Sequence, residues 1–100
     1  MMELTDRQKR HLRGLGHPLK PLVMLGQHGL TDAVVRELDQ ALEAHELVKL
    51  RARAGDRAAR DEALDTLATR TGAALVQRIG NVGLYYRASR RQPRIVLPGA

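Results

Sequence analysis

The sequence predicts a compact two-layer α/β sandwich whose elements follow the order α-β-α-β-α-β-β. Segments with the apolar period of a helix alternate with short apolar or strictly alternating segments, which are typical of strands. Residues that cap helices, and glycines that end them, separate these segments. With 100 residues, of which 43% are hydrophobic and 28% charged, the chain is long enough for one domain with one core.

The first helix is predicted from Thr5 to about Leu15. Thr5 and Gln8 have the spacing of a capping box, and Gly14 or Gly16 is expected to end the helix. The leucines share one side of this helix, and we expect that side to pack against the core. The opposite side is a basic stripe that carries Lys9, Arg10 and Arg13.

Residues 17–21 contain two prolines and predict an extended connector. The apolar run at 22–25 predicts a buried strand. Thr31 or Gly29 is expected to begin a second helix that ends near His45. The outer face of this helix should repel nucleic acid, because it is acidic and carries Glu37, Asp39 and Glu43.

Residues 47–53 alternate apolar and basic side chains, which predicts a half-buried strand with a basic outer face. Asp56 has the chemistry of an N-cap and is expected to begin a third helix, which Gly72 ends. Residues 73–79 then predict a third strand.

A turn at 80–83 is expected to lead into a hairpin strand at 84–87. The chain has no Phe or Trp, and its two aromatic residues, Tyr85 and Tyr86, are adjacent in this strand. Strand alternation should place one of them in the core and the other outside. One stacked base is therefore the most that we expect an RNA ligand to find.

The domain is expected to span residues 1–88, followed by an Arg-rich tail at 89–100. The apolar residues 95–97 of this tail could add a short edge strand to the sheet.

The net charge of +6 is unevenly distributed. Residues 1–65 carry eleven Lys or Arg and eleven Asp or Glu, whereas residues 66–100 carry six Arg and no acid. A second basic stretch without acids spans residues 7–20. Such segregation is typical of a face that binds nucleic acid, although solubility or the codon bias of a GC-rich genome would also give many arginines.

The segment Gly26-Gln27-His28-Gly29 lies between a predicted strand and a predicted helix. Glycine has no Cβ, so a ligand can approach this backbone closely, and the helix that follows directs free N–H groups toward the turn. Phosphates bind in such places, and His28 could also donate to a phosphate or ribose. The alternative interpretation is a tight turn without a ligand.

The chain has no cysteine, which excludes disulfides and thiolate metal sites and is consistent with a reducing cytoplasm. Its four histidines lack metal-ligand spacing, and no nucleophile–base set or nucleotide-binding fingerprint is present. It also lacks an apolar run of about 20 residues and an apolar signal segment. We therefore expect a cytoplasmic monomer with no catalytic residues, no metal, no cofactor and no membrane partner.

Several segments together resemble a known family. They are Leu-Thr-Asp-Arg-Gln-Lys-Arg-His-Leu-Arg-Gly-Leu-Gly-His-Pro-Leu-Lys-Pro at 4–21, Val-Met-Leu-Gly-Gln-His-Gly-Leu-Thr at 23–31, His-Glu-Leu-Val-Lys-Leu at 45–50, and Tyr86-Arg87. This pattern resembles the CRM domain (chloroplast RNA splicing and ribosome maturation) in its stand-alone bacterial YhbY-type form. The likeness covers about residues 3–87.

The resemblance implies a fold similar to the C-terminal domain of bacterial translation initiation factor 3, with a GxxG loop that contacts RNA as in KH domains. Bacterial stand-alone members of the family are associated with precursors of the large ribosomal subunit, and plant relatives assist group II intron splicing. Lys20 matches the basic connector of the family, and Arg87 matches the basic residue that ends its last strand. Two positions depart from the pattern: Gln27 replaces a frequent basic residue, and Gly83 replaces an apolar strand residue, which suggests a bulged hairpin.

We therefore predict a protein that binds structured ribosomal RNA during assembly of the large subunit. The glycines allow close approach, amides near Leu30 and Thr31 receive a phosphate, and cations neutralise neighbouring phosphates. The expected RNA-binding residues are Lys9, Arg10, Arg13, Lys20, Gly26, Gln27, His28, Gly29, Leu30, Thr31 and Arg87. The alternative is a basic module that docks on a ribosomal or assembly protein without recognising RNA. An RNA-modifying enzyme would need a catalytic site that the sequence does not provide.

Overall fold

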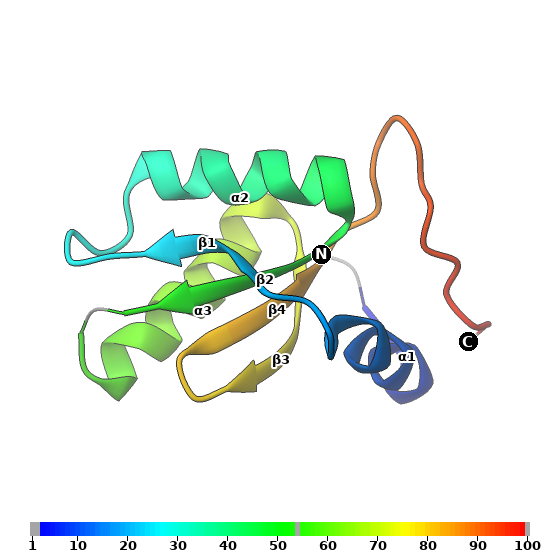
Figure 1. Ribbon diagram of the computed structural model, residues 1–100, viewed down its shortest axis with the longest axis horizontal. Coiled ribbons are helices and arrows are strands. Elements are labelled where there is room, and N and C mark those ends of the chain that lie inside the picture. The colour runs from blue at the N-terminus through cyan, green and yellow to red at the C-terminus, as the bar shows by residue number, and fades with distance from the viewer. Residues whose placement is uncertain (1–2, 54, 100) are drawn as a thin grey trace.

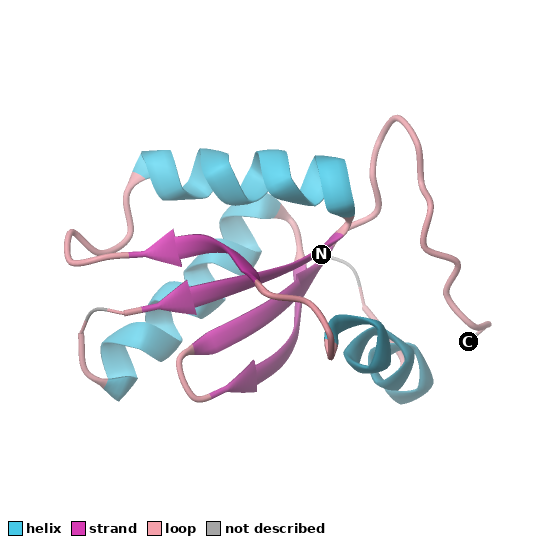
Figure 2. Ribbon diagram, viewed as in Figure 1, coloured by secondary structure: helices cyan, strands magenta, loops and turns pink. Residues whose placement is uncertain are grey.

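The computed structural model describes residues 3–53 and 55–99. Within these residues the element order is the one that the sequence predicts (Figures 1 and 2). The elements are α1 (Asp6–Gly16), β1 (Pro21–Leu25), α2 (Asp32–His45), β2 (Leu47–Ala52), α3 (Arg57–Thr71), β3 (Ala74–Ile79) and β4 (Val82–Tyr86).

The strands form one four-stranded mixed sheet in the order β1-β2-β4-β3. β1 and β2 are parallel and are joined through α2, whereas β2 with β4 and β3 with β4 are antiparallel. The β3–β4 hairpin turns on two residues, Gly80 and Asn81, and Gly80 has φ 56°. β1 therefore lies at one edge of the sheet and β3 at the other.

The two faces of the sheet are covered differently. α2 and α3 lie against one face and enclose the main core, in which Leu38, Leu50 and Leu67 are fully buried. α1 packs on the opposite face, where Leu12 contacts a second apolar cluster that includes Leu84. Figure 1 shows α1 near one end of the sheet, so much of this second face is open.

The predicted helix caps are confirmed. Thr5 and Gln8 form the capping box, in which Gln8 N donates to Thr5 Oγ1 at 3.1 Å and Thr5 N donates to Gln8 Oε1 at 3.0 Å. Thr31 caps α2, and Asp56 caps α3 by accepting from Ala59 N at 2.8 Å. These bonds satisfy backbone donors that a helix cannot satisfy by itself.

The prediction that β1 is a buried strand is wrong for one of its faces. Val23 and Leu25 are buried on one face, but the side chains on the other face remain open, with Leu22 55% and Met24 39% exposed. β1 is an edge strand whose second face is not covered by a helix. Leu15 of α1 is also exposed rather than packed.

The expectation that one tyrosine lies outside the core is also wrong. Tyr85 is 0% exposed and donates from its hydroxyl to the carbonyl oxygen of Leu64 at 2.7 Å. Tyr86, on the other face of β4, is 3% exposed because it belongs to the cluster under α1. Neither ring is available to stack on a base.

Gly83 lies within β4 rather than in the turn, and the irregularity of the hairpin falls in β3, between Leu75 and Gln77. A Cβ on Gly83 would come within 3.0 Å of Tyr85 Cε2 and 3.2 Å of Leu64 Cδ2. Core side chains thus fill the space above this glycine, which explains why a larger strand residue is absent.

The C-terminal tail is ordered by two glutamates and contains no strand within residues 87–99. Glu46, which is fully buried and has φ 67°, accepts from the backbone N–H groups of Ser89, Arg94 and Ile95 at 2.7–2.8 Å. Glu43 accepts from the Ser89 hydroxyl at 2.5 Å. Of the apolar residues 95–97, which were expected to form an edge strand, Ile95 and Leu97 instead pack on the cluster under α1, whereas Val96 is 83% exposed.

Candidate nucleic-acid interface

The GxxG segment forms a tight turn at the end of β1. Gly29 N donates to the carbonyl oxygen of Gly26 at 3.0 Å, and Gly29 has φ 71°, a left-handed conformation that favours glycine. Within residues 3–53 and 55–99, no acceptor receives the N–H groups of Gln27, His28 or Leu30. Gly26, Gln27 and His28 are exposed. The turn therefore presents free backbone donors to solvent, as an anion site requires.

The segment after the turn holds it against the body of the domain. Leu30 packs on the main core, and Thr31 Oγ1 accepts from Val34 N at 3.3 Å to begin α2. The positive end of the α2 dipole faces the turn. Asp32 adds a negative charge to the first turn of α2, and Arg70 compensates with a guanidinium nitrogen 3.1 Å from the carboxylate.

A hollow of about 370 Å³ lies between the turn and the first half of α3. His28, Gly29 and Leu30 form one side of it, and Ala59 and Glu62 lie on the other. The carboxylate of Glu62 makes this hollow unsuited to a phosphate.

The structure does not bring the basic residues of α1 to the turn. α1 leads into the start of β1, whereas the turn follows the end of β1, so the two lie at opposite ends of this strand (Figure 1). A five-residue strand is about 15 Å long. Arg10 and Arg13 would therefore contact a different part of a nucleic acid from the one at Gly26.

Lys9 differs from the other expected residues because it lies near two carboxylates. It lines a hollow at the β3 side of the molecule together with Glu3 and Asp65. These two carboxylates lower the attraction of that region for phosphate, so Lys9 is less suited to a phosphate contact than Arg10.

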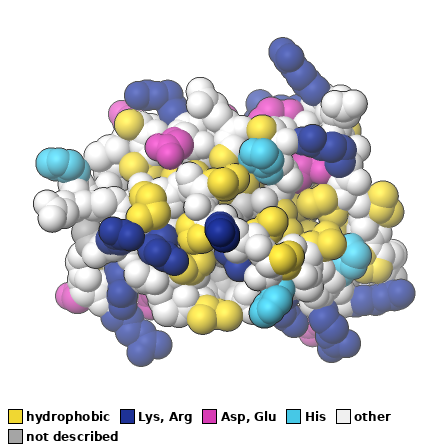
Figure 3. Space-filling view, in the orientation of Figure 1, with side chains coloured by type: hydrophobic (Ala, Val, Ile, Leu, Met, Phe, Trp, Pro, Cys, Tyr) yellow, Lys and Arg dark blue, Asp and Glu magenta, His cyan; other side chains and the backbone are white. Residues whose placement is uncertain are grey.

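Cations of β2 occupy the gap between α1 and the turn. Lys49 is paired in register with Pro21, and Arg51 with Met24. Arg53 follows the end of β2, where its N–H donates to the carbonyl oxygen of Leu25 at 2.8 Å. In the view of Figure 3, basic side chains lie among apolar ones across the open face of the sheet.

These β2 cations were absent from the site expected from sequence. The signal was present in the alternation of residues 47–53, which indicated a basic outer face. Only the sheet order shows that β2 is adjacent to β1 and that this face stays uncovered.

Comparison with known proteins identifies the family. Residues 4–87 match the family model of the CRS1/YhbY (CRM) domain. The chain belongs to the CRS1/YhbY family.

The similarity of this CRM domain to its relatives extends over almost its whole length. An RNA-binding protein of Haemophilus influenzae is 41% identical over 98 residues, which cover 98% of each chain. The "Probable RNA-binding protein YqeI" of Bacillus subtilis is 34% identical and covers 95% of this chain and 99% of its own. The solution structure of a hypothetical Staphylococcus aureus protein, described as a candidate RNA binder, has a TM-score of 0.81 at 34% identity, covering 96% of this chain and 100% of its own.

In this CRM domain Arg87 does not face solvent, contrary to the expectation for a phosphate contact. Its side chain is 10% exposed, and its Nη1 donates to Asp39 Oδ1 at 2.6 Å and to the carbonyl oxygen of Thr71 at 2.7 Å. Nη2 donates to the carbonyl oxygen of Asp39 at 3.1 Å. Arg87 thus joins α2, the end of α3 and β4, and we exclude it from the candidate interface.

Several carboxylates on α2 and α3 of this CRM domain form ion pairs or hydrogen bonds with other parts of the chain. Arg78 contacts Asp65 at 2.5 Å and Asp61 at 3.8 Å on α3. The Ser89 hydroxyl and the N–H groups of Arg90 and Arg91 lower the pKa of the Glu43 carboxyl to about 2. These hydrogen bonds stabilise the ionised form of Glu43, so this part of the acidic face predicted for α2 is contacted by the tail but keeps its negative charge.

The part of the chain that the structure describes offers neither a metal site nor a membrane-spanning helix. It contains no group of three or more His, Asp or Glu side chains that could hold a metal ion. None of its described helices has the length and apolar character needed to span a bilayer.

Proposed function

We propose that this protein binds structured ribosomal RNA as a non-catalytic accessory factor in assembly of the large ribosomal subunit. The observation that carries this proposal is the turn at 26–29, whose free N–H groups adjoin a row of cations on an open sheet face. Backbone donors and cations recognise phosphates, which every RNA supplies. The names of its relatives support RNA as the ligand.

In this proposal the turn binds one phosphate of the RNA, and the cations bind the neighbouring phosphates along the RNA strand. The RNA backbone next to β1 contacts Lys20, Arg51 and Arg53. Phosphates that lie beyond the start of β1 contact Arg10 and Arg13. Because both tyrosines are buried, recognition depends on the RNA backbone and shape rather than on aromatic stacking.

The turn is tested most cleanly by Gly26→Asp. A Cβ at Gly26 meets no atom within 4 Å, and its φ is not positive, so the domain should fold normally. Gly29 is a poorer choice because its φ of 71° would strain any other residue. We expect RNA affinity to fall by about tenfold, roughly 1.4 kcal/mol, because the new carboxylate repels the phosphate and fills the approach.

Gly99→Asp is the matched control, since it adds the same charge at another glycine with no atom within 4 Å of a Cβ. Equal affinities of the two variants would remove the turn from the proposed site. The biological assignment is tested by crosslinking in cells with sequencing of the bound RNA. Crosslinks concentrated in large-subunit RNA support it, whereas an association that resists RNase would favour a protein partner.

A further inference from the structure

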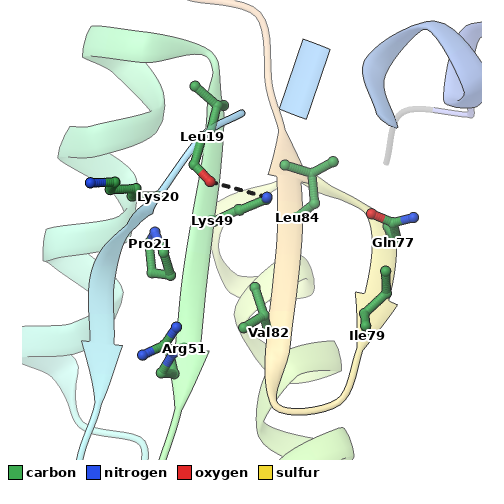
Figure 4. Close-up of a pocket in the computed structure, with 9 residues that line it drawn as sticks. All are labelled: Leu19, Lys20, Pro21, Lys49, Arg51, Gln77, Ile79, Val82 and Leu84. Atoms are coloured by element: carbon green, nitrogen blue, oxygen red, sulfur yellow. Dashed lines mark hydrogen bonds between the residues drawn. The ribbon is translucent and has the colours of Figure 1, made fainter. Parts of the chain in front are cut away.

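The open face of the sheet contains a hollow of about 310 Å³, and none of the residues that line it belongs to the turn at 26–29 (Figure 4). Val82 and Leu84 of β4 form its apolar floor, and Ile79 of β3 stands at one side with 65% of its surface exposed. We call this feature the sheet hollow. Its volume lies at the lower end of the range for small-ligand sites, which suits one flat group rather than a long segment.

The charges around the sheet hollow are all positive. Lys20, Lys49 and Arg51 line it, and no carboxylate does. Lys49 is held in place because its Nζ donates to the carbonyl oxygen of Leu19 at 3.1 Å. Arg51 is half-buried, and no carboxylate in the described part of the chain pairs with it. A cation in this state favours an anionic ligand, since burial without a counter-charge costs free energy.

The charged side chains of the hollow lie toward β1 and β2, where Leu19 and Pro21 also line it, and its β3 side carries no charge. Figure 4 shows Lys20 and Arg51 toward β1, and Ile79 with Gln77 toward β3. A ligand that fits must therefore carry its negative charge along the β1 edge and a flat, weakly polar group toward β3. A nucleotide within an RNA strand has this division, because its phosphates lie on one side and its base on the other.

We propose that the sheet hollow receives the base of one unpaired nucleotide of the bound RNA. The base lies over Val82 and against Ile79, and its flanking phosphates contact Lys20 and Arg51. Aliphatic side chains and a guanidinium plane here take the role that exposed aromatic rings have in other RNA-binding sheets. This inference rests on the RNA-binding function proposed above and adds a preference for RNA with an unpaired nucleotide.

RNA is favoured over an acidic peptide because the cations continue beyond the hollow. Arg53 lies at the end of β2, level with the end of β1, from which the turn at 26–29 follows. One RNA strand along β1 would thus reach both the hollow and the free N–H groups. Two anion sites in line suit the regular row of phosphates along one RNA strand.

The test uses the absence of cysteine from the chain. Ile79→Cys introduces a single thiol at the hollow, and Val96→Cys introduces one on the tail, where the native residue is 83% exposed. Each variant is treated with iodoacetamide alone, with a fully paired RNA hairpin, and with the same hairpin carrying one unpaired nucleotide. We expect only the bulged hairpin to slow alkylation at position 79, and neither RNA to slow it at position 96.

Affinity provides a second readout. Ile79→Ser should reduce the preference for bulged over paired hairpin by roughly tenfold, since the burial of one aliphatic side chain against a base contributes on this scale. Val96→Ser should leave that preference unchanged. If both RNAs bind and protect the thiol at position 79 equally, the inference is overturned while RNA binding stands. If neither RNA binds, the proposed function fails and this inference fails with it.

Discussion

Arg87 shows why a charged residue can be assigned the wrong role when only its type is known. Its guanidinium donates to Asp39 and to the carbonyl oxygen of Thr71, so it joins helices rather than reaching a ligand. Arg87→Lys keeps the charge but cannot reproduce the planar set of bonds. We expect it to destabilise the fold by about 2 kcal/mol, because polar groups lose their partners.

Denaturant unfolding measures this loss, and RNA binding below the unfolding transition should change less than about twofold. A variant with normal stability but weak RNA binding would restore Arg87 to the interface.

Gly83 illustrates a second constraint on single residues, which is the space left by the core. Gly83→Ala would place a Cβ within 3.2 Å of Leu64 and closer still to Tyr85. Overpacking of this kind costs about 1–3 kcal/mol. Gly14→Ala is the control, because that helical position is open and alanine there should stabilise α1 by about 0.5–1 kcal/mol. Thermal unfolding of both variants should therefore shift in opposite directions.

At the scale of elements, the hydrogen bonds by which Glu43 and Glu46 hold the C-terminal tail should be lost in acid. Burial alone would raise the pKa of Glu46, but three backbone N–H donors outweigh it and the pKa lies below its usual value of 4.5. The pKa of Glu43 is about 2. Because both are depressed in the folded state, their stabilisation is complete above about pH 4.5 and is lost as the pH falls toward 2.

Hydrogen exchange of the Arg94 and Ile95 amides should report this release, while core amides such as that of Leu50 stay protected. Glu46→Ala removes the acceptors of all three N–H groups and should free the tail at neutral pH, at a cost of about 2 kcal/mol. Unchanged protection of Ile95 in that variant would show that apolar packing alone holds the tail.

Local sequence signals were sufficient for the order of elements and for the helix caps. Each helix cap accepts a hydrogen bond from the N–H group three residues along the chain, so the roles of Thr5, Thr31 and Asp56 can be inferred without tertiary structure. The exposure of β1 and the burial of Tyr86 could not be inferred in this way. Both depend on which face α1 and the tail cover, which is decided by contacts between residues far apart in the chain.

The same distinction applies to the candidate site. The turn at 26–29 was recognisable from glycine spacing, and its free donors follow from local geometry. The contribution of Arg51 was not recognisable, because it requires that β2 neighbour β1 and that no helix cover both. The sheet hollow likewise combines residues from all four strands of the sheet and from the connector before β1.

For the whole molecule, the segregation of charge makes a quantitative prediction about RNA affinity. If the cations of α1 and of the sheet face together neutralise five or six phosphates, the logarithm of affinity should fall with the logarithm of salt concentration at a slope of about −4 to −5. Titrations of one structured RNA between low and moderate salt give this slope directly.

Variants then identify which cations contribute to it. Arg51→Ala should make the slope shallower by about 1, because one phosphate loses its partner. Arg87→Lys should leave it unchanged, since that side chain is committed to Asp39. A slope near zero for the native protein would mean that the exposed cations do not meet phosphates. The free backbone donors of the turn would then be the sole basis of binding, and Gly26→Asp would abolish it rather than weaken it.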